Sequence, residues 1–252
     1  DVLQRQPEPV NLRSGIREQI QKDKHEYAAA WLQHDSQDRV NPFHFFRGLR
    51  NTLEDEDVLV VDDGNHTFLA AELMPIHRPG CFISPTDFNC MGYAVPAAIG
   101  VKLANPDKHV AAVVGDGAFT MTCMEILTAA SQNLGIVFFV FHDGELSQIS
   151  QAQEIPYNRK TCTVLGNLDV AGVAKATGAR FLALERNVDV DQVMSKAWSL
   201  ADDNVPVIVD VKIDYSKRTR FTEGIVVTNL KRFNLGTKAR FIGRALVRKV
   251  TG

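Results

Sequence analysis

Short apolar runs at regular intervals constrain the fold of this chain more than any other feature. The clearest run is Ile136–Phe141, six consecutive apolar residues that predict a strand covered on both faces. Further runs occur at Val58–Asp62, Val110–Val114, Phe181–Leu184 and Val205–Val211. Short apolar strands that alternate with helices favour an α/β fold, in which a parallel, doubly wound sheet of about six strands carries helices on both faces.

The helices expected around these strands show apolar residues at a spacing of three to four. They are Ile16–Leu32, His44–Leu53, Gly92–Leu103, Thr122–Asn133, Val170–Thr177 and Val190–Ala201. Pro42 suits the first turn of the second helix. In the fourth helix we expect the apolar residues Met124, Ile126, Leu127 and Ala130 to be buried.

Composition excludes several classes of protein. The 252 residues are 45% hydrophobic and 23% charged, which rules out a disordered or fibrous chain. No stretch approaches the roughly 18 apolar residues of a membrane-spanning helix. The four cysteines show no CxxC spacing and no signal-like segment is present, so we expect a reducing, cytoplasmic location. Because the sequence begins with Asp1, we interpret it as a piece of a longer protein.

Charge is distributed unevenly along the chain. Residues 215–252 contain ten Lys or Arg and one acid, Glu223, so this segment carries +9 and the rest carries −11 of the total of −2. Between Lys238 and Lys249 the cations surround apolar residues, which is typical of a basic amphipathic helix. We favour packing of this tail on the acidic part of the same chain or a partner. Contact with an anionic membrane surface is less favoured, and no recognition fold supports nucleic-acid binding.

Two of the predicted strands end in acidic residues, at the sheet edge where ligands bind in such folds. The first leads into Gly115-Asp116-Gly117-Ala118-Phe119 and a helix, and the next leads into His142-Asp143-Gly144-Glu145. The glycines let backbone approach a ligand, and the helix start offers N–H groups to an anion. If the strands are neighbours, Asp116 and Asp143 can share a Mg²⁺ ion that bridges to phosphate oxygens. For an isolated GDG, a tight turn with an exposed acid is the more frequent explanation.

Three ordered segments resemble thiamine-diphosphate-dependent enzymes of the acetolactate (acetohydroxyacid) synthase-like family. GDG followed by His142-Asp143 resembles the family's GDG and NN cofactor motif. Asp62-Asp-Gly-Asn-His66 resembles its D-x-G-x-H segment, and NCMGYAVPAAIG at 89–100 resembles its x-x-M-G-[YF]-x-[LV]-P-A-A-I-G. The resemblance covers about residues 40–212 and is to the C-terminal, diphosphate-binding domain.

This resemblance implies three regions in the chain. Residues 1–40 would be the end of a preceding domain and a linker. Residues 41–214 would be the thiamine-diphosphate-binding domain, and residues 215–252 a basic C-terminal extension.

Thiamine diphosphate and Mg²⁺ are the implied cofactors, and the resemblance assigns residues to each. Asp116, Asp143 and the main-chain carbonyl of Glu145 would bind the metal. Met91 would bend the cofactor, and the carbonyl of Asn89 would hold its aminopyrimidine, which brings the amino group near the thiazolium C2 proton. The implied cofactor-binding residues are Asn65, His66, Asn89, Met91, Gly115, Gly117, Ala118 and Gly144.

The substrate side departs from the family pattern. His142-Asp143 replaces Asn-Asn, which keeps an oxygen ligand and adds a negative charge. Gln148 and Ala152 stand where the family's G-M-V-x-Q-W-Q has Met and Trp, so we expect a wider, more polar pocket. His142 and Gln148 are the candidate substrate-facing side chains, with Met91 and Asn89 as the other catalytic candidates. A structural strand-end histidine and a solvated helix-face glutamine remain the alternatives.

The resemblance also implies a missing part. In this family a Glu from a separate pyrimidine-binding domain protonates the cofactor, and no segment of this sequence resembles that domain. We expect it on another chain or in a missing segment, within a homo- or hetero-oligomer. The implied function is the diphosphate- and Mg-binding part of an acetolactate synthase-like decarboxylating carboligase that acts on 2-oxo acids. A 2-oxo acid decarboxylase, another C–C lyase and a non-catalytic cofactor-binding subunit are the alternatives.

Overall fold

The computed structural model describes residues 15–251, and for residues 155, 156, 225–227 and 229 it describes the backbone path alone. The chain divides into two compact units, residues 1–35 and 36–252. The described part of the first unit is built around helix α1, Ile16–Leu32, with the predicted bounds. Within it the rings of Tyr27 and Trp31 meet edge to face at 6.4 Å. Residues 1–14 of the predicted N-terminal segment 1–40 lie outside the described residues.

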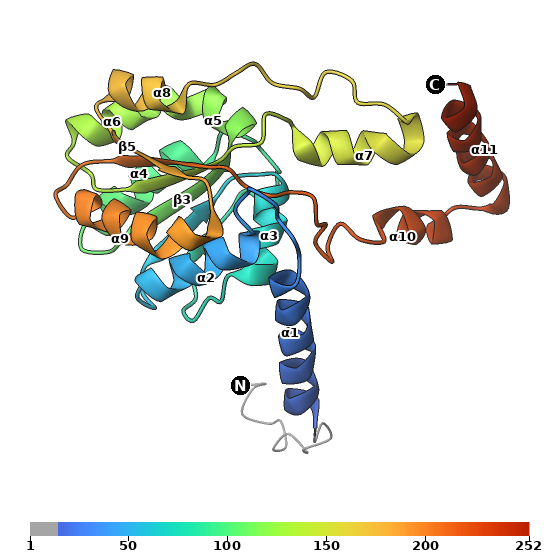
Figure 1. The fold of residues 1–252 in the computed structure, drawn as a ribbon, viewed down its shortest axis with the longest axis horizontal. Helices are drawn as coiled ribbons and strands as arrows, with labels where there is room; N and C mark the ends of the chain where they lie inside the picture. Colours follow the sequence, from blue (N-terminus) through green and yellow to red (C-terminus); the bar gives the residue numbers. More distant parts are fainter. Residues whose placement is uncertain (1–14, 252) are drawn as a thin grey trace, which may run out of the picture. The chain divides into compact units, whose positions relative to one another are not determined.

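The second unit contains one parallel sheet of six strands in the order β2-β1-β3-β4-β6-β5 (Figure 1). The strands are β1 Val58–Val61, β2 Phe82–Ile83, β3 Val110–Gly115, β4 Val137–Phe141, β5 Arg180–Leu184 and β6 Val207–Val211. The sheet confirms the predicted fold class. The short edge strand β2 was not predicted, because two residues carry no apolar periodicity.

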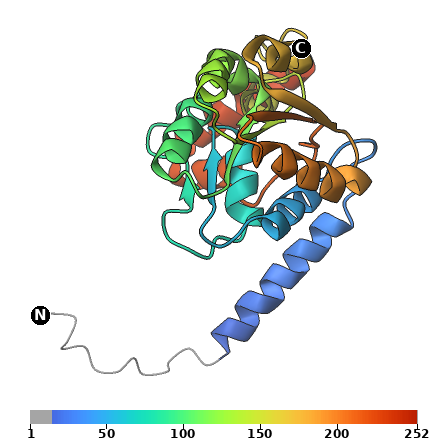
Figure 2. The ribbon, with the colours of Figure 1, turned by 90° about the vertical axis from the view of Figure 1, so that its left-hand side faces the viewer.

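Helices cover both faces of the sheet, and the two layers stay separate in the view turned by 90° (Figure 2). One layer is formed by α4, α5, α6 and α8, and the other by α2, α3 and α9. Their bounds are α2 Pro42–Thr52, α3 Asn65–Leu73, α4 Ala94–Ala104, α5 Asp116–Thr122, α6 Ile126–Ser131, α7 Ser147–Tyr157, α8 Val170–Thr177 and α9 Val190–Ala201. Two 3-10 helices, η2 Cys123–Glu125 and η3 Asn187–Asp189, precede α6 and α9.

Strand β4 explains why both faces must be covered. All five of its residues are buried. Phe138 and Val140 belong to the apolar core beneath α4, α5, α6 and α8. Phe139 and Phe141 point to the other layer, where the ring of Phe45 on α2 lies 5.1 Å and 4.7 Å from theirs. Alternate side chains along a strand point to opposite faces, so an unbroken apolar run is stable only between two layers.

The helix predicted at Thr122–Asn133 differs from the observed one. The helical path begins at Asp116 and is interrupted by η2 before α6. Ile126 is buried as predicted, whereas Met124 and Leu127 are exposed, at 56% and 52%. The other buried positions of this segment are Cys123 and Ala129, which were not predicted. Two apolar stripes run along this segment, and only packing against α4 decides which one faces the core.

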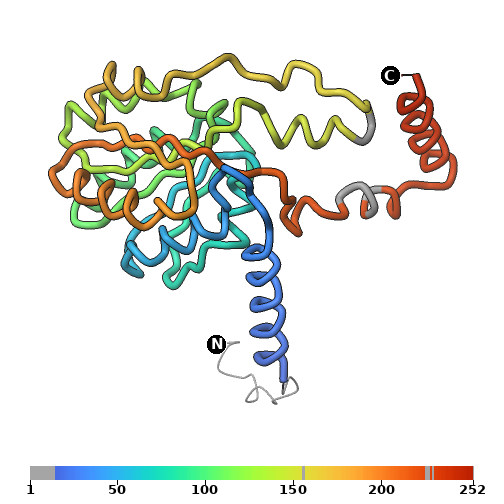
Figure 3. Tube along the Cα trace, in the orientation of Figure 1, coloured from blue at the N-terminus to red at the C-terminus, as the bar shows by residue number. Residues whose placement is uncertain are grey.

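The basic tail forms two helices, α10 Ile225–Arg232 and α11 Leu235–Thr251. The chain can be followed from β6 to these helices in Figure 3. Helix α11 contacts α7, and the guanidinium of Arg248 lies 4.8 Å above the ring of Tyr157. The tail therefore packs in part on the same chain. Among the described residues no helix is long and apolar enough to cross a membrane.

Candidate functional site

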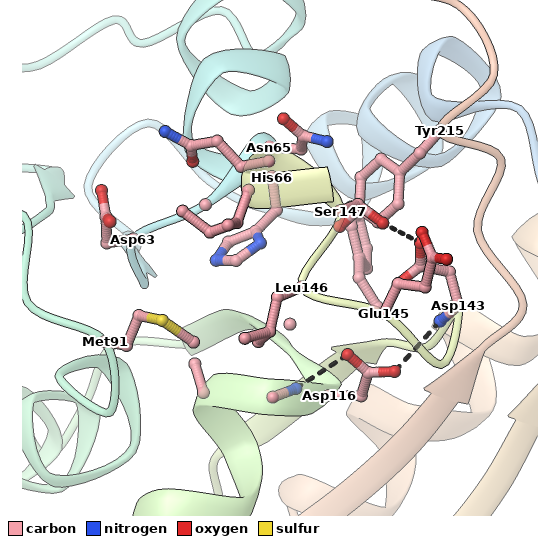
Figure 4. A pocket seen from close by; sticks show the side chains of 17 residues that line it. Asp63, Asn65, His66, Met91, Asp116, Asp143, Glu145, Leu146, Ser147 and Tyr215 are labelled. Atoms are coloured by element: carbon pink, nitrogen blue, oxygen red, sulfur yellow. Dashed lines mark hydrogen bonds between the residues drawn. The ribbon is translucent and has the colours of Figure 1, made fainter. Parts of the chain in front are cut away.

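A pocket opens beyond the carboxyl ends of β1, β3 and β4, between the starts of α3, α5 and α7 (Figure 4). The pocket is partly open to solvent, and its cavity volume is about 90 Å³. Its lining residues are Asp63, Gly64, Asn65, His66, Met91, Gly115, Asp116, Gly117, Ala118, Phe141, Asp143, Glu145, Leu146, Ser147, Gln148, Ile149 and Tyr215. The three sequence segments that predicted the site therefore meet at one place.

Asp116 joins the ends of β3 and β4. The strands are neighbours, and their register places Gly115 opposite Phe141. The buried Asp116 carboxylate accepts hydrogen bonds from the main-chain N–H groups of Gly117 and Gly144, both at 2.7 Å. Gly144 presents its N–H from a left-handed conformation with φ 78°, which favours glycine. Burial raises the pKa of Asp116, although these hydrogen bonds favour the charged form.

Asp143 lies beside Asp116, as the predicted strand order required. Its main-chain N–H donates to the Asp116 carboxylate at 3.3 Å, and its own carboxylate accepts a hydrogen bond from the Ser147 hydroxyl. Burial raises the pKa of Asp143 to about 6, with a further contribution from the nearby Asp116 charge. Two adjacent carboxylates in a partly buried site repel each other, and this repulsion favours a bound cation.

His66 lines the pocket from helix α3, across from the two acids. It lies in the first turn of α3, where its ring passes over Gly115, and a Cβ added to that glycine would lie 3.0 Å from Cε1 of the ring. The side chain is buried, and its Nε2 has no hydrogen-bond partner among the described residues. Burial lowers the pKa of His66 to about 3, so the ring is neutral. A buried ring nitrogen without a partner is unusual and indicates a group that binds there.

Met91 and Leu146 are apolar side chains that line the pocket close to Gly117. A Cβ added to Gly117 would lie 2.5 Å from Cδ2 of Leu146 and 3.6 Å from Cε of Met91. A larger residue at this position would therefore displace the Leu146 side chain, whereas the Met91 distance is an ordinary contact. In Figure 4 Met91 and Asp63 lie on one side of the pocket, and Asp143 and Tyr215 lie on the other.

Two predicted residues, His142 and Glu145, have surroundings that the sequence did not indicate. His142 does not line the pocket; its Nδ1 lies 3.0 Å from Oδ1 of Asp210 and its Nε2 lies 4.0 Å from the Asp116 carboxylate. The hydrogen bond to Asp210 raises the pKa of His142. The Glu145 side chain binds Lys160 at 2.7 Å, which lowers the pKa of this carboxyl.

The other predicted residues divide into two groups. Asn65, Gly115, Ala118 and Gln148 line the pocket, whereas Asn89 and Gly144 are not among its lining residues. Asn89 is exposed and adopts a left-handed conformation with φ 51°. Ala152, expected to widen the pocket, is also exposed and does not line it. Helix α7 presents its first turn to the pocket, and Ala152 lies beyond that turn.

Sequence reasoning missed two polar residues. Asp62 is buried, and its carboxylate accepts hydrogen bonds from the main-chain N–H groups of Gly92 at 2.9 Å and Ala94 at 2.6 Å. This acid therefore fixes the start of α4 to the end of β1. Tyr215 lines the pocket from the segment after β6, inside the region predicted as an extension. An acid directly after an apolar strand was a signal for Asp62, but nothing local marks Tyr215.

The residues of the pocket can supply only part of the ligands of a metal ion. They fit a metal ion that also binds a diphosphate better than one that is bound by protein side chains alone. Among residues 15–251 no cluster of three His, Cys, Asp or Glu side chains forms a metal site. Asp116 and Asp143 supply two carboxylates, and further oxygens would have to come from main chain or ligand. The glycine-lined start of α5 and the buried, unpartnered Nε2 of His66 are features that such a ligand requires.

Fold and site together define a thiamine-diphosphate-binding domain. Residues 62–211 match the family described as "Thiamine pyrophosphate enzyme, C-terminal TPP binding domain", and the chain belongs to this family. The match confirms the resemblance found in the sequence, and thiamine diphosphate is the cofactor of the domain.

Relatives in the family carry out different reactions. The chain is 30% identical to the acetolactate synthase of Bacillus subtilis (strain 168) over 179 residues, which are 71% of this chain and 31% of that protein. It is 31% identical to 2-hydroxyacyl-CoA lyase 2 of Homo sapiens over 217 residues, or 85% of this chain and 33% of that protein. The chain thus spans about a third of the length of these relatives.

A solved structure shows the same fold. It is the thiamine diphosphate-dependent 4-hydroxybenzoylformate decarboxylase of Rhodococcus jostii RHA1, with a TM-score of 0.66 and 20% identity. The similarity covers 71% of this chain and 34% of that one.

Proposed function

We propose that this chain is the diphosphate- and Mg²⁺-binding part of an acetolactate synthase-like enzyme that decarboxylates a 2-oxo acid and joins the product to an acceptor. The observation that carries this proposal is the pair Asp116 and Asp143, held side by side by the hydrogen bond from the Asp143 N–H to Asp116. The pair opens into a pocket whose other polar wall is the buried His66. Identity with acetolactate synthases supports the reaction class.

Each part of the pocket has a separate task in this proposal. Asp116, Asp143 and the main-chain carbonyl of Glu145 hold Mg²⁺. The metal-bound diphosphate lies along the glycines that begin α5. The remaining residues that would contact the cofactor are Asn65, His66, Asn89, Met91, Ala118 and Gly144. Thiamine diphosphate, when bound, supplies carbanion stabilisation that no protein side chain provides.

The chain's own residues prepare the pocket for this chemistry. Neutral His66 can offer one ring nitrogen as a donor or acceptor without adding positive charge. The apolar side chain of Met91 can orient a flexible ligand in the pocket. Gln148 adds an amide to the lining, which suits a polar substrate.

A companion pyrimidine-binding domain completes the site in this proposal. Met121 on α5, Met124 on η2 and Leu127 on α6 follow one another at intervals of three residues and are exposed at 58%, 56% and 52%. Clustered apolar side chains at a protein surface favour contact with another domain or subunit. We propose that this surface meets the companion domain, in an oligomer located in the cytoplasm.

A second candidate is a C–C lyase. The match to human 2-hydroxyacyl-CoA lyase 2 extends over 85% of this chain, compared with 71% for the acetolactate synthase of Bacillus subtilis (strain 168) and 82% for the acetolactate synthase catalytic subunit of Saccharomyces cerevisiae. The replacement of the family's Met by Gln148 also favours a substrate more polar than pyruvate.

The test is calorimetric titration of the 252-residue chain with thiamine diphosphate, with Mg²⁺ and with EDTA, followed by product analysis with a companion domain present. Mg²⁺-dependent binding and acetolactate from pyruvate are expected. Cleavage of a 2-hydroxyacyl thioester without acetolactate would favour the lyase. Cofactor binding without any turnover would favour a non-catalytic subunit, and no binding would reject the proposal.

A further inference from the structure

Tyr215 lines the pocket from outside the part of the chain that carries the family motifs. It follows β6 by four residues, after Ile213 has paired with Val40. Its ring lies 6.3 Å from that of Phe141, on the same side of the pocket as Asp143 (Figure 4). The residues that line this side with it include Asn65, Asp143 and Ser147.

The hydroxyl of Tyr215 is buried and has no hydrogen-bond partner among the described residues. Burying a hydroxyl without a partner is unfavourable, and a phenylalanine would keep the aromatic packing on Phe141 without that penalty. Ser147, which lines the pocket with Tyr215, donates its hydroxyl to Asp143. The Tyr215 hydroxyl is therefore a hydrogen-bond donor beside the pocket that is available to a bound ligand.

The location of this donor indicates what it binds. A phenol is protonated near neutral pH, so Tyr215 can donate to an anionic oxygen. The apolar side chain of Met91 suits the rings of the cofactor, and the opposite side of the pocket, at Asp116 and Asp143, suits its metal-bound diphosphate. Tyr215 lies on the same side of the pocket as Asp143, where the diphosphate is expected.

We propose that Tyr215 is a cofactor-binding residue that donates a hydrogen bond to a terminal phosphate oxygen of thiamine diphosphate. The inference rests on the proposed function. It extends the binding site beyond residue 211, where the family match ends, into the segment that the sequence indicated only as a basic extension.

Tyr215→Phe is the decisive variant, because it removes only the hydroxyl. Tyr157→Phe is the control, since Tyr157 lies at the far end of α7 and does not line the pocket. Titrations of each chain with Mg²⁺-pyrophosphate, Mg²⁺-thiamine diphosphate and Mg²⁺-thiamine monophosphate separate the contact to the terminal phosphate from other contacts. Thermal unfolding with and without each ligand gives a second readout that does not need turnover.

The expected pattern differs from that of a structural tyrosine. Tyr215→Phe should weaken binding of pyrophosphate and thiamine diphosphate at least about tenfold, as for a lost hydrogen bond to a charged group. Binding of thiamine monophosphate should not change. The ligand-free variant should melt at or above the wild-type temperature, because an unpaired buried hydroxyl is gone.

Two results would overturn the inference. Wild-type affinity of Tyr215→Phe for pyrophosphate would exclude the hydrogen bond and leave the proposed function intact. A lower melting temperature without ligand, with equal loss for all three ligands, would assign Tyr215 a structural role. If wild type itself binds no Mg²⁺-pyrophosphate or Mg²⁺-thiamine diphosphate, the proposed function fails, and this inference fails with it.

Discussion

The carboxylate of Asp116 accepts a hydrogen bond of 2.7 Å from the main-chain N–H of Gly144, and this bond ties the turn after β4 to the end of β3. The same carboxylate is our first metal ligand. One residue therefore both shapes the turn that carries Asp143 and places the pair of acids at the pocket. Folding and ligand binding are coupled at this position, and a substitution of Asp116 should disturb both.

Replacing Asp116 with Ala should abolish Mg²⁺-dependent binding of thiamine diphosphate and destabilise the fold by about 1–3 kcal/mol, because buried N–H groups lose their acceptor. Calorimetric titration and urea unfolding measure the two effects. Asp63→Ala, which removes a lining acid outside the pair, should bind metal and cofactor nearly as wild type does. Unchanged binding by Asp116→Ala would contradict the metal assignment.

The 252-residue chain alone should release no carbon dioxide from 2-oxo acids, because the proposed companion domain supplies the acid that activates the cofactor. Adding that domain should restore turnover. Coupled carbon dioxide assays with and without the companion measure this. A Leu127→Lys chain, altered at the exposed apolar surface, should need a higher companion concentration, while Val188→Lys, exposed on η3, should behave as wild type does. Robust release by the chain alone would disprove the division of the site.

His66 should make the fold sensitive to acid. Its folded-state pKa of about 3 lies below the ordinary value of 6.5, so the unfolded chain binds a proton that the folded chain excludes. The stability from this difference is present above pH 6.5 and is lost as the pH falls toward the folded pKa. Between about pH 7.5 and 5 the loss amounts to about 2 kcal/mol.

Urea unfolding of wild type and His66→Gln at several pH values tests this sign and size. The variant should have a shallower decrease of the free energy of unfolding toward acid. His77→Gln, at an exposed histidine, is the matched control and should keep the wild-type slope. Equal slopes in all three proteins would show that His66 is not a buried neutral group.

Gln148 should set substrate preference without affecting the cofactor. Gln148→Met restores the family's thioether and removes an amide whose hydrogen bond is worth about 0.5–1.5 kcal/mol, so kcat/KM for polar substrates should fall by roughly 2- to 13-fold. The ratio of kcat/KM for a polar and an apolar substrate, measured with the companion domain, is the readout. Gln132→Met, exposed after α6, should leave the ratio unchanged. A constant ratio in Gln148→Met would remove it from the substrate pocket.

The structure does not support a wider pocket at Ala152. This residue is exposed on α7 and does not line the described pocket. The first turn of α7, with Gln148 and Ile149, is the part that borders it. Specificity changes are therefore better sought at these two positions.

The sequence by itself determined the architecture, because burial on two faces requires unbroken apolar strands. The run at β4 and the helices α1, α8 and α9 were predicted with nearly or fully observed bounds. It also placed Asp116 and Asp143 together, since the carboxyl ends of neighbouring parallel strands share one edge. The bounds of helices and strands follow from the spacing of apolar residues, and the order of motifs along the chain indicated which strands are neighbours. Both could therefore be predicted from the sequence.

Only the tertiary structure decided which groups face the pocket. Met124 and Leu127 are apolar yet exposed, and His142 turns toward Asp210, because each depends on packing with elements distant in sequence. Tyr215 reaches the site from beyond β6 through a backbone path with no local pattern to mark it. A side chain's direction and burial are set by contacts between separate segments, which composition and spacing along one segment do not contain.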